Sequence, residues 1–309
     1  MKPSVVLCLI LLGVLAIGAV LTPLVMIAIG WALHLFPALQ KVSSFDIDRV
    51  LSRVLLIASF LLLYLFRKQL ALKDIFRTAF PRRAGWFSEV MQGAGLGVAT
   101  LAVLIGITLF TGIRRLEIEP FGMRYGTVVS QALLTAAVVA CIEEVFFRGF
   151  ILKTLMNDIK AVWAVVISAA FYSIVHFTQI GSHPHFAQGD LLSGFKTVGL
   201  MLEPLSHPSV YLPEFIGLFA FGIVLAYAYV WTKSLYVSIG IHAGCVFIVK
   251  ADSLFVAVNQ GQRYGFYGTE KMVDGVLSWI ILGVLLVALW MLIGRRGAFL
   301  PGRAADLSR

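Results

Sequence analysis

Charged residues are scarce in this chain, because Asp, Glu, Lys and Arg together make up only 13% of its 309 residues. Soluble proteins contain about 25% charged residues. Here 60% of the residues are hydrophobic and the mean hydropathy is +0.92. The composition therefore excludes an ordinary soluble domain and predicts an integral membrane protein.

Other familiar patterns are missing as well. The three cysteines, Cys8, Cys141 and Cys245, show no CxxC spacing, so we expect free, apolar-packed thiols. The chain contains no His-Glu-x-x-His zinc motif and no visible internal repeat or low-complexity tract. Its longest polar stretches are connections between apolar runs, which excludes a soluble domain of any size.

Long apolar runs dominate what remains. A spanning helix needs about 20 mostly apolar residues. Eight runs are candidates: 4–33, 50–66, 88–113, 127–152, 161–177, 215–232, 234–256 and 273–294. They predict an all-α, polytopic membrane bundle of about eight transmembrane helices, with seven or nine also possible. The first run exceeds the apolar core of a secretory signal and is interpreted as a retained anchor.

Basic residues predict the orientation of the bundle. They gather after the second run and in the tail, as Arg67, Lys68, Lys73, Arg77, Arg82, Arg83, Arg295, Arg296, Arg303 and Arg309. Since cytoplasmic loops are rich in Lys and Arg, we expect both termini in the cytoplasm, in a bacterial inner (plasma) membrane. This bias and the attraction to anionic lipid explain the net charge of +9, so no nucleic-acid partner is expected.

The pattern of residues 69–80 is compatible with either an interfacial helix or a basic loop.

Three ionisable residues interrupt the run 127–152. Glu143, Glu144 and Arg148 lie within six residues, although each charge near a bilayer centre costs about 2.5–3.5 kcal/mol. Glu144 and Arg148 are spaced i, i+4 and can form a salt bridge. Glu143 projects about 100° away around the helix and is left uncompensated.

Two histidines are predicted at the depth of Glu143. Glu143 lies 16 residues before Ile159 and His176 lies 17 residues after it, so a tight hairpin brings them to one height. His242 joins them if Lys153 and Lys233 both reach the same interface. A lone carboxylate beside two imidazoles could take up a proton, pair with a cation or bind a metal. The set also suits water activation, which favours a hydrolytic centre over a structural charge.

The order of these motifs resembles the CAAX protease and bacteriocin-processing (CPBP) intramembrane peptidases. The similarity rests on Glu-Glu-x-x-x-Arg (Glu143, Glu144, Arg148), aromatic-x-x-x-His (Tyr172, His176) and Ser-Leu-x-x-x-Ile-x-x-His (Ser234, Leu235, Ile239, His242). It implies a catalytic core at 127–247, between N-terminal helices with a basic loop (1–126) and a C-terminal helix with a basic tail (248–309). By this resemblance Glu143 is the general base, His176 assists it and His242 stabilises the oxyanion.

The resemblance leaves the cofactor and the substrate open. Glu143, His176 and His242 would bind a divalent metal such as zinc if one is used, and a metal-free mechanism is the alternative. Two positions depart from the family pattern: Tyr172 replaces the usual Phe, and Val246 replaces an Asn often found four residues after the last histidine. The expected partner is a peptide or protein substrate at the lipid bilayer, such as a prenylated C-terminal peptide, a bacteriocin leader or a membrane-protein tail.

Two other function classes fit parts of the pattern. Intramembrane Glu and His residues also build proton relays, which suggests a proton-coupled transporter, but paired repeats are not visible. Val246 favours a catalytically silent scaffold or immunity protein. A second His-x-His pair, His183 and His185 with Asp190 nearby, predicts metal binding only weakly.

Overall fold

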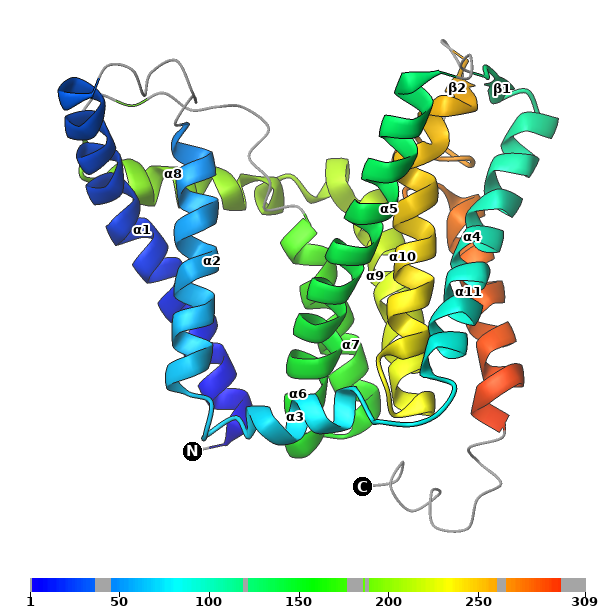
Figure 1. Cartoon of the computed structure of the whole chain (residues 1–309), viewed down its shortest axis with the longest axis horizontal. Coiled ribbons are helices and arrows are strands. Elements are labelled where there is room, and N and C mark those ends of the chain that lie inside the picture. Colours follow the sequence, from blue (N-terminus) through cyan, green and yellow to red (C-terminus); the bar gives the residue numbers. More distant parts are fainter. Residues whose placement is uncertain are drawn as a thin grey trace. The chain divides into compact units, whose positions relative to one another are not determined.

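The computed structural model describes residues 2–36, 46–118, 122–176, 186, 189–259 and 265–295. Its main helices are α1 (Pro3–Leu35), α2 (Ile47–Leu65), α3 (Leu72–Ala79), α4 (Trp86–Phe110), α5 (Met123–Glu144), α6 (Lys153–Asp158), α7 (Ala161–His176), α8 (Ser193–Leu202), α9 (Pro208–Thr232), α10 (Tyr236–Ala251) and α11 (Val276–Leu289) (Figure 1). A π-helix, η2 (Val145–Leu152), joins α5 to α6. The predicted all-α class is confirmed.

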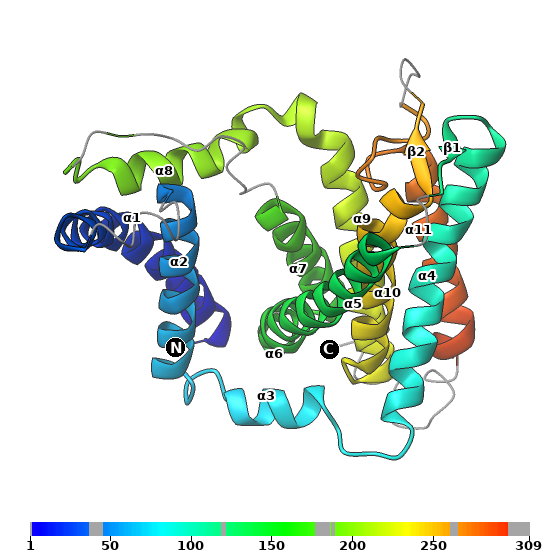
Figure 2. The ribbon, with the colours of Figure 1, turned by 45° about the horizontal axis from the view of Figure 1, so that its top comes forward.

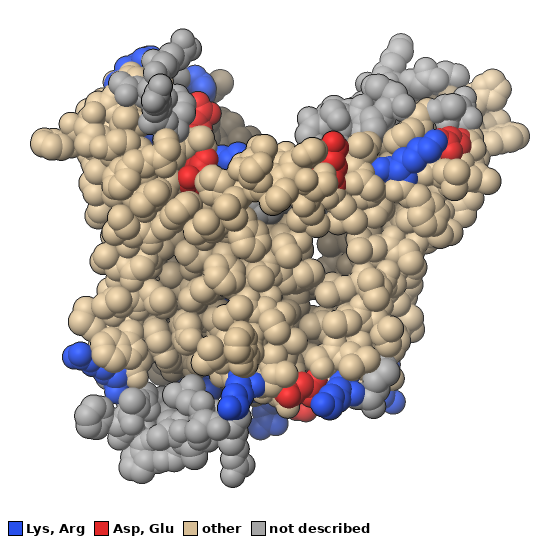
Figure 3. Space-filling model, turned by 180° about the vertical axis from the view of Figure 1, so that it is seen from behind, with Lys and Arg blue, Asp and Glu red and all other residues tan. Residues whose placement is uncertain are grey.

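The membrane character is confirmed too. Among the described residues, six helical segments are long and apolar enough to span a bilayer: Pro3–Leu35, Trp86–Phe110, Met123–Asp158, Pro208–Thr232, Tyr236–Leu254 and Val276–Gly294. Helix α7 is apolar but shorter, and α2 carries Asp48, Arg49 and Arg53 in its first two turns. On the face shown in Figure 3, the Lys, Arg, Asp and Glu residues lie towards the upper and lower margins, and the visible surface between them is made of other residues.

The chain divides into two compact units. One contains Met1–Leu72 and Ile174–Tyr211, where α8 packs on α1 and α2. The other contains Lys73–Ser173 and Leu212–Arg309. The boundary between the units falls inside the core predicted at 127–247. The predicted division into 1–126, 127–247 and 248–309 is based on sequence motifs and stays a prediction.

Glycines bring α4 and α10 together in the second unit. Figures 1 and 2 show α10 beside α4 on one side and α5 on the other. A Cβ at Gly93 or Gly97 would lie 2.4 or 2.2 Å from a carbonyl oxygen of α10, and one at Gly240 or Gly244 would meet α4 as closely. Small residues allow such close packing between membrane helices. These four glycines therefore allow the backbones of α4 and α10 to approach closely.

Two sequence expectations differ from the structure. The run predicted to continue to residue 113 ends as a helix at Phe110, because Gly112 takes a left-handed φ of 74°. The chain then forms β1 (Arg114–Leu116), which pairs antiparallel with β2 (Val256–Val258). The three cysteines are free, but Cys8 and Cys141 are exposed, so only Cys245 is packed inside.

The glycine contact generates a stability prediction. Gly97→Ala should lower the melting temperature of the detergent-solubilised protein, because overpacking against Ile241 costs about 1–3 kcal/mol. Gly95→Ala is the matched control on the same helix, since a Cβ there meets nothing within 4 Å. It should be neutral or slightly stabilising. Equal melting temperatures for both variants would contradict the contact.

Candidate active site

The two adjacent glutamates stand where α5 changes into the π-helix η2. Glu144 is the last residue of α5 and is 0% exposed, whereas the Glu143 side chain is 27% exposed. π-helical segments are rare and occur frequently at functional sites. The neighbouring carboxylates therefore occupy different environments, one inside the protein and one partly accessible.

Glu144 forms the ion pair predicted with Arg148. Arg148 Nη1 donates to Glu144 Oε1 at 2.8 Å, and Arg148 is only 1% exposed. Its Nη2 donates to the carbonyl oxygen of Gly222 in α9 at 3.1 Å, and its guanidinium lies 4.5 Å from the ring centroid of Tyr172 in α7. One buried cation thus connects three helical segments, which is the structural role expected of this pair.

His242 lies between both glutamates. Its Nδ1 is 2.9 Å from Glu144 Oε1, and its Nε2 is 3.8 Å from Glu143 Oε2. The residue is 3% exposed, and its ring meets Phe221 edge-on at 5.5 Å. The prediction that Glu143 and His242 meet at one depth is confirmed.

The contact between Glu144 and His242 was not foreseen from the sequence, which assigned Glu144 to Arg148 alone. Glu144 accepts from both partners through the same oxygen, Oε1. A carboxylate paired with a guanidinium is an acceptor, so His242 Nδ1 carries the donated hydrogen. This orients the imidazole and directs Nε2 towards Glu143. Glu144 and His242 are 98 positions apart in the sequence. Helical periodicity gives no sign of a contact over that separation.

Tyr172 and His176 lie one turn apart on α7. Tyr172 is buried and belongs to the second unit, where its ring packs edge-on against Phe147 at 4.9 Å. His176 is the last residue of α7 and belongs to the first unit. Its approach to Glu143 therefore stays a prediction.

The donor set bears on the proposed metal. Glu143 and His242 could supply two ligands, and Glu144 would be the outer carboxylate that orients a metal-bound histidine. Within the ranges that the structure describes, however, no group of three His, Cys, Asp or Glu side chains is arranged to hold a metal ion. The described set is thus one ligand short of a metal site.

The weaker His-x-His candidate, His183 and His185, lies outside the described residues. Asp190, its expected acidic neighbour, forms an ion pair with Lys196 at 2.7 Å. Val246, one turn beyond His242 on α10, has an apolar side chain and can donate no hydrogen bond.

The fold and the cluster define a polytopic membrane protein with a buried carboxylate–histidine centre. Comparison with known families then identifies the segment that carries it: residues 125–248 match the type II CAAX prenyl endopeptidase Rce1-like model. This segment is an Rce1-like domain of the CPBP family, a family of proteases. No curated protein and no solved structure gives a significant match.

The buried ion pair generates a second prediction. Glu144→Ala should destabilise the protein by about 3–5 kcal/mol, because Arg148 would remain as an uncompensated buried charge. Thermal unfolding in detergent measures the loss. Glu117→Ala is the control, since it removes the carboxylate of an exposed pair with Arg115 and should change stability little. Wild-type stability of Glu144→Ala would contradict the structural role of the pair.

Proposed function

We propose that the protein is an intramembrane endopeptidase in which Glu143 activates water to attack a peptide bond. The family of residues 125–248 supports a protease. The observation that carries the assignment to Glu143 is its position: its buried Oε2 faces Nε2 of His242 while the side chain as a whole is partly exposed, whereas Glu144 is fully buried in the ion pair. A general base must be accessible to the proton that it removes.

The proposed steps balance as follows. Glu143 takes a proton from water while the water oxygen bonds to the scissile carbonyl carbon. The carbonyl oxygen becomes negatively charged, and a hydrogen-bond donor beside it lowers the barrier. When the intermediate collapses, the C–N bond breaks and Glu143 passes its proton to the leaving amine. The products are a carboxylic acid and an amine.

His242 is proposed as the donor to the oxyanion. Its Nδ1 is held by Glu144, so only Nε2 is directed towards Glu143 and the reacting atoms. Nε2 can donate only when the imidazole carries a proton on both ring nitrogens, which the proposed step requires. Because Val246 supplies no donor, His242 carries this role without the amide that the family often has.

His176 is proposed to assist Glu143 in positioning the water. The support is sequence spacing, since His176 follows Tyr172 by four residues on α7. A helix places such residues on one face, and Tyr172 packs edge-on towards His242, with ring centroids 6.3 Å apart. The role therefore extends the described cluster by one helical turn.

The substrate is proposed to be a membrane-associated peptide, such as a prenylated C-terminal peptide, cleaved near the cytoplasmic leaflet. Support comes from the family and from the basic connection after α2, because cytoplasmic loops of membrane proteins are rich in Lys and Arg. Both termini are proposed to lie there, in a bacterial inner membrane.

Substitution tests the assignment of the catalytic groups. Glu143→Ala or His176→Ala in the purified, reconstituted protein should lower peptide cleavage by at least about 100-fold, because general base catalysis contributes 10²–10⁴. Melting temperatures should stay near that of the wild type. Mass spectrometry of released peptides provides the readout, and Glu117→Ala is the active control. Normal cleavage by either variant would refute its role, and biological activity retained in Glu143→Ala without hydrolysis would favour a scaffold or transporter.

Chelation tests the cofactor. Since the steps above pass through no metal, EDTA treatment followed by dialysis should leave the rate of peptide release unchanged. Calcium-saturated EDTA controls for effects of the chelator itself. Loss of cleavage that returns with zinc, but not with magnesium, would show instead that the glutamate and histidine ligands hold a metal.

A further inference from the structure

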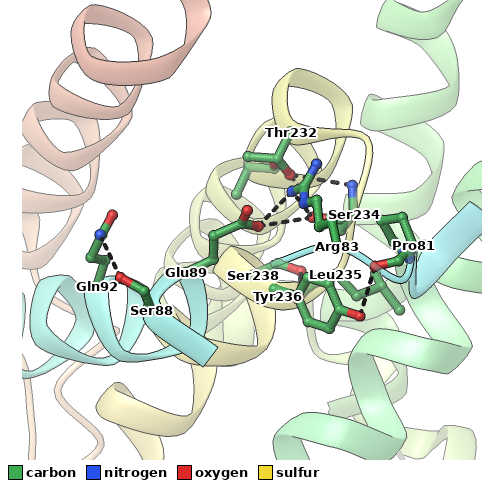
Figure 4. A network of polar contacts seen from close by, with 11 residues as sticks. Pro81, Arg83, Ser88, Glu89, Gln92, Thr232, Ser234, Leu235, Tyr236 and Ser238 are labelled. Carbon is green, nitrogen blue, oxygen red and sulfur yellow. Dashed lines mark hydrogen bonds and ion pairs between the residues drawn. The ribbon is translucent and has the colours of Figure 1, made fainter. Parts of the chain in front are cut away.

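The connection from α3 to α4 is fastened to the start of α10 (Figure 4). Arg83 Nη2 donates to Ser234 Oγ at 3.1 Å and to Glu89 Oε2 at 2.6 Å. The backbone N–H of Leu235 donates to the carbonyl oxygen of Ala79 at 3.0 Å. The Tyr236 hydroxyl donates to the carbonyl oxygen of Pro81 at 3.2 Å. These bonds fix residues 79–83 to the loop between α9 and α10, and we call this assembly the basic joint.

The basic joint carries more positive charge than it neutralises. Residues 73–85 contain four cations, Lys73, Arg77, Arg82 and Arg83, and one acid, Asp74. Lys233 adds a further exposed cation directly before Ser234. Arg83 is paired with Glu89, whereas Lys73, Arg77 and Arg82 form no ion pair with any residue that the structure describes. Arg82 is thus a cation without an ion-pair partner among the described residues, and the surface as a whole keeps a net positive charge that favours an external anion.

Lys233 adds a second sign of a functional surface. It has a φ of +55° at the end of α9, where its N–H donates to the carbonyl oxygen of Tyr229 at 2.8 Å. Glycine usually takes this left-handed position after a helix. A side chain there carries an energetic cost, which strained positions at ligand-binding surfaces often show.

Exposed aromatic side chains follow these cations in the sequence. Trp86 and Phe87 follow Arg82 and Arg83 at the start of the apolar helix α4, and they are 49% and 59% exposed. Trp86 also contacts Tyr236, with ring centroids 5.7 Å apart, so it is held at the joint. Aromatic residues next to Lys and Arg at the end of a span are typical of the headgroup level of a bilayer.

We propose that the basic joint binds the headgroups of anionic phospholipids through Arg82 and Lys233, with Trp86 and Phe87 inserted beside the acyl chains. The apolar partners favour a lipid over a free phosphate, because a soluble anion would use the cations and leave the aromatic rings exposed. Arg83 stays in its pair with Glu89 and Ser234 and holds the binding surface together.

Lipid-dependent thermal stability tests this surface without any assay of cleavage. Purified protein in a neutral detergent is titrated with phosphatidylglycerol or phosphatidylcholine, and its melting temperature is followed. Phosphatidylglycerol should stabilise the wild type more. In the double variant Arg82→Gln/Lys233→Gly, the phosphatidylglycerol needed for half of the shift should rise about 25-fold, because each cation near an anionic lipid surface contributes roughly fivefold. Glycine suits the left-handed backbone at position 233, so this variant should fold.

The control removes two cations elsewhere. Arg115→Gln/Lys250→Gln alters exposed residues on β1 and in the last turn of α10, and its response to phosphatidylglycerol should match the wild type. Equal responses of the joint variant and the control would overturn the proposal. So would a full shift produced by inorganic phosphate, which would indicate a site for a free anion. If Arg82→Gln/Lys233→Gly proves unstable, the single variant Arg82→Gln gives the second test, with a loss of about fivefold expected.

Discussion

A single buried carboxylate oxygen holds the centre of this protein together. Glu144 Oε1 accepts from Arg148 on its own helical segment and from His242 on α10. A buried charge is costly unless it is paired and hydrogen-bonded. Glu144 meets both conditions with two donors that come from different parts of the chain. The same oxygen therefore pairs with Arg148 and orients His242. Without it, neither donor has its buried acceptor.

The helices around this oxygen are built to keep it in place. Glycines on α4 and α10 let their backbones touch, so α10 has little freedom to slide or rotate. The π-helical segment after Glu144 carries Arg148, which reaches the Gly222 carbonyl of α9. Just before α10 begins, the hydrogen bonds of Arg83 with Glu89 and Ser234 hold the start of that helix in place. The position of His242 thus depends on contacts two turns away.

Sequence reasoning identified the residues of the buried cluster and missed one connection among them. Glu143, Glu144, Arg148 and His242 stood out because charges in an apolar run are costly, and i, i+4 spacing identified the ion pair. Helical spacing along one segment cannot show that a side chain from α10 reaches the same oxygen. The apolar pattern of the sequence also gave no sign of the π-helix or of the short β1–β2 pair. A widened helical turn and three-residue strands leave that pattern unchanged.

By itself, the sequence determined the membrane class, the positions of the apolar helices and the family motifs, because these depend on composition and on spacing within about 20 residues. Only the tertiary structure decided which carboxylate is buried and which is accessible. Glu143 and Glu144 are chemically identical neighbours, and their difference arises when α9 and α10 bring Gly222 and His242 against one side of the helix. Burial and pairing depend on the surrounding helices, which local sequence does not specify.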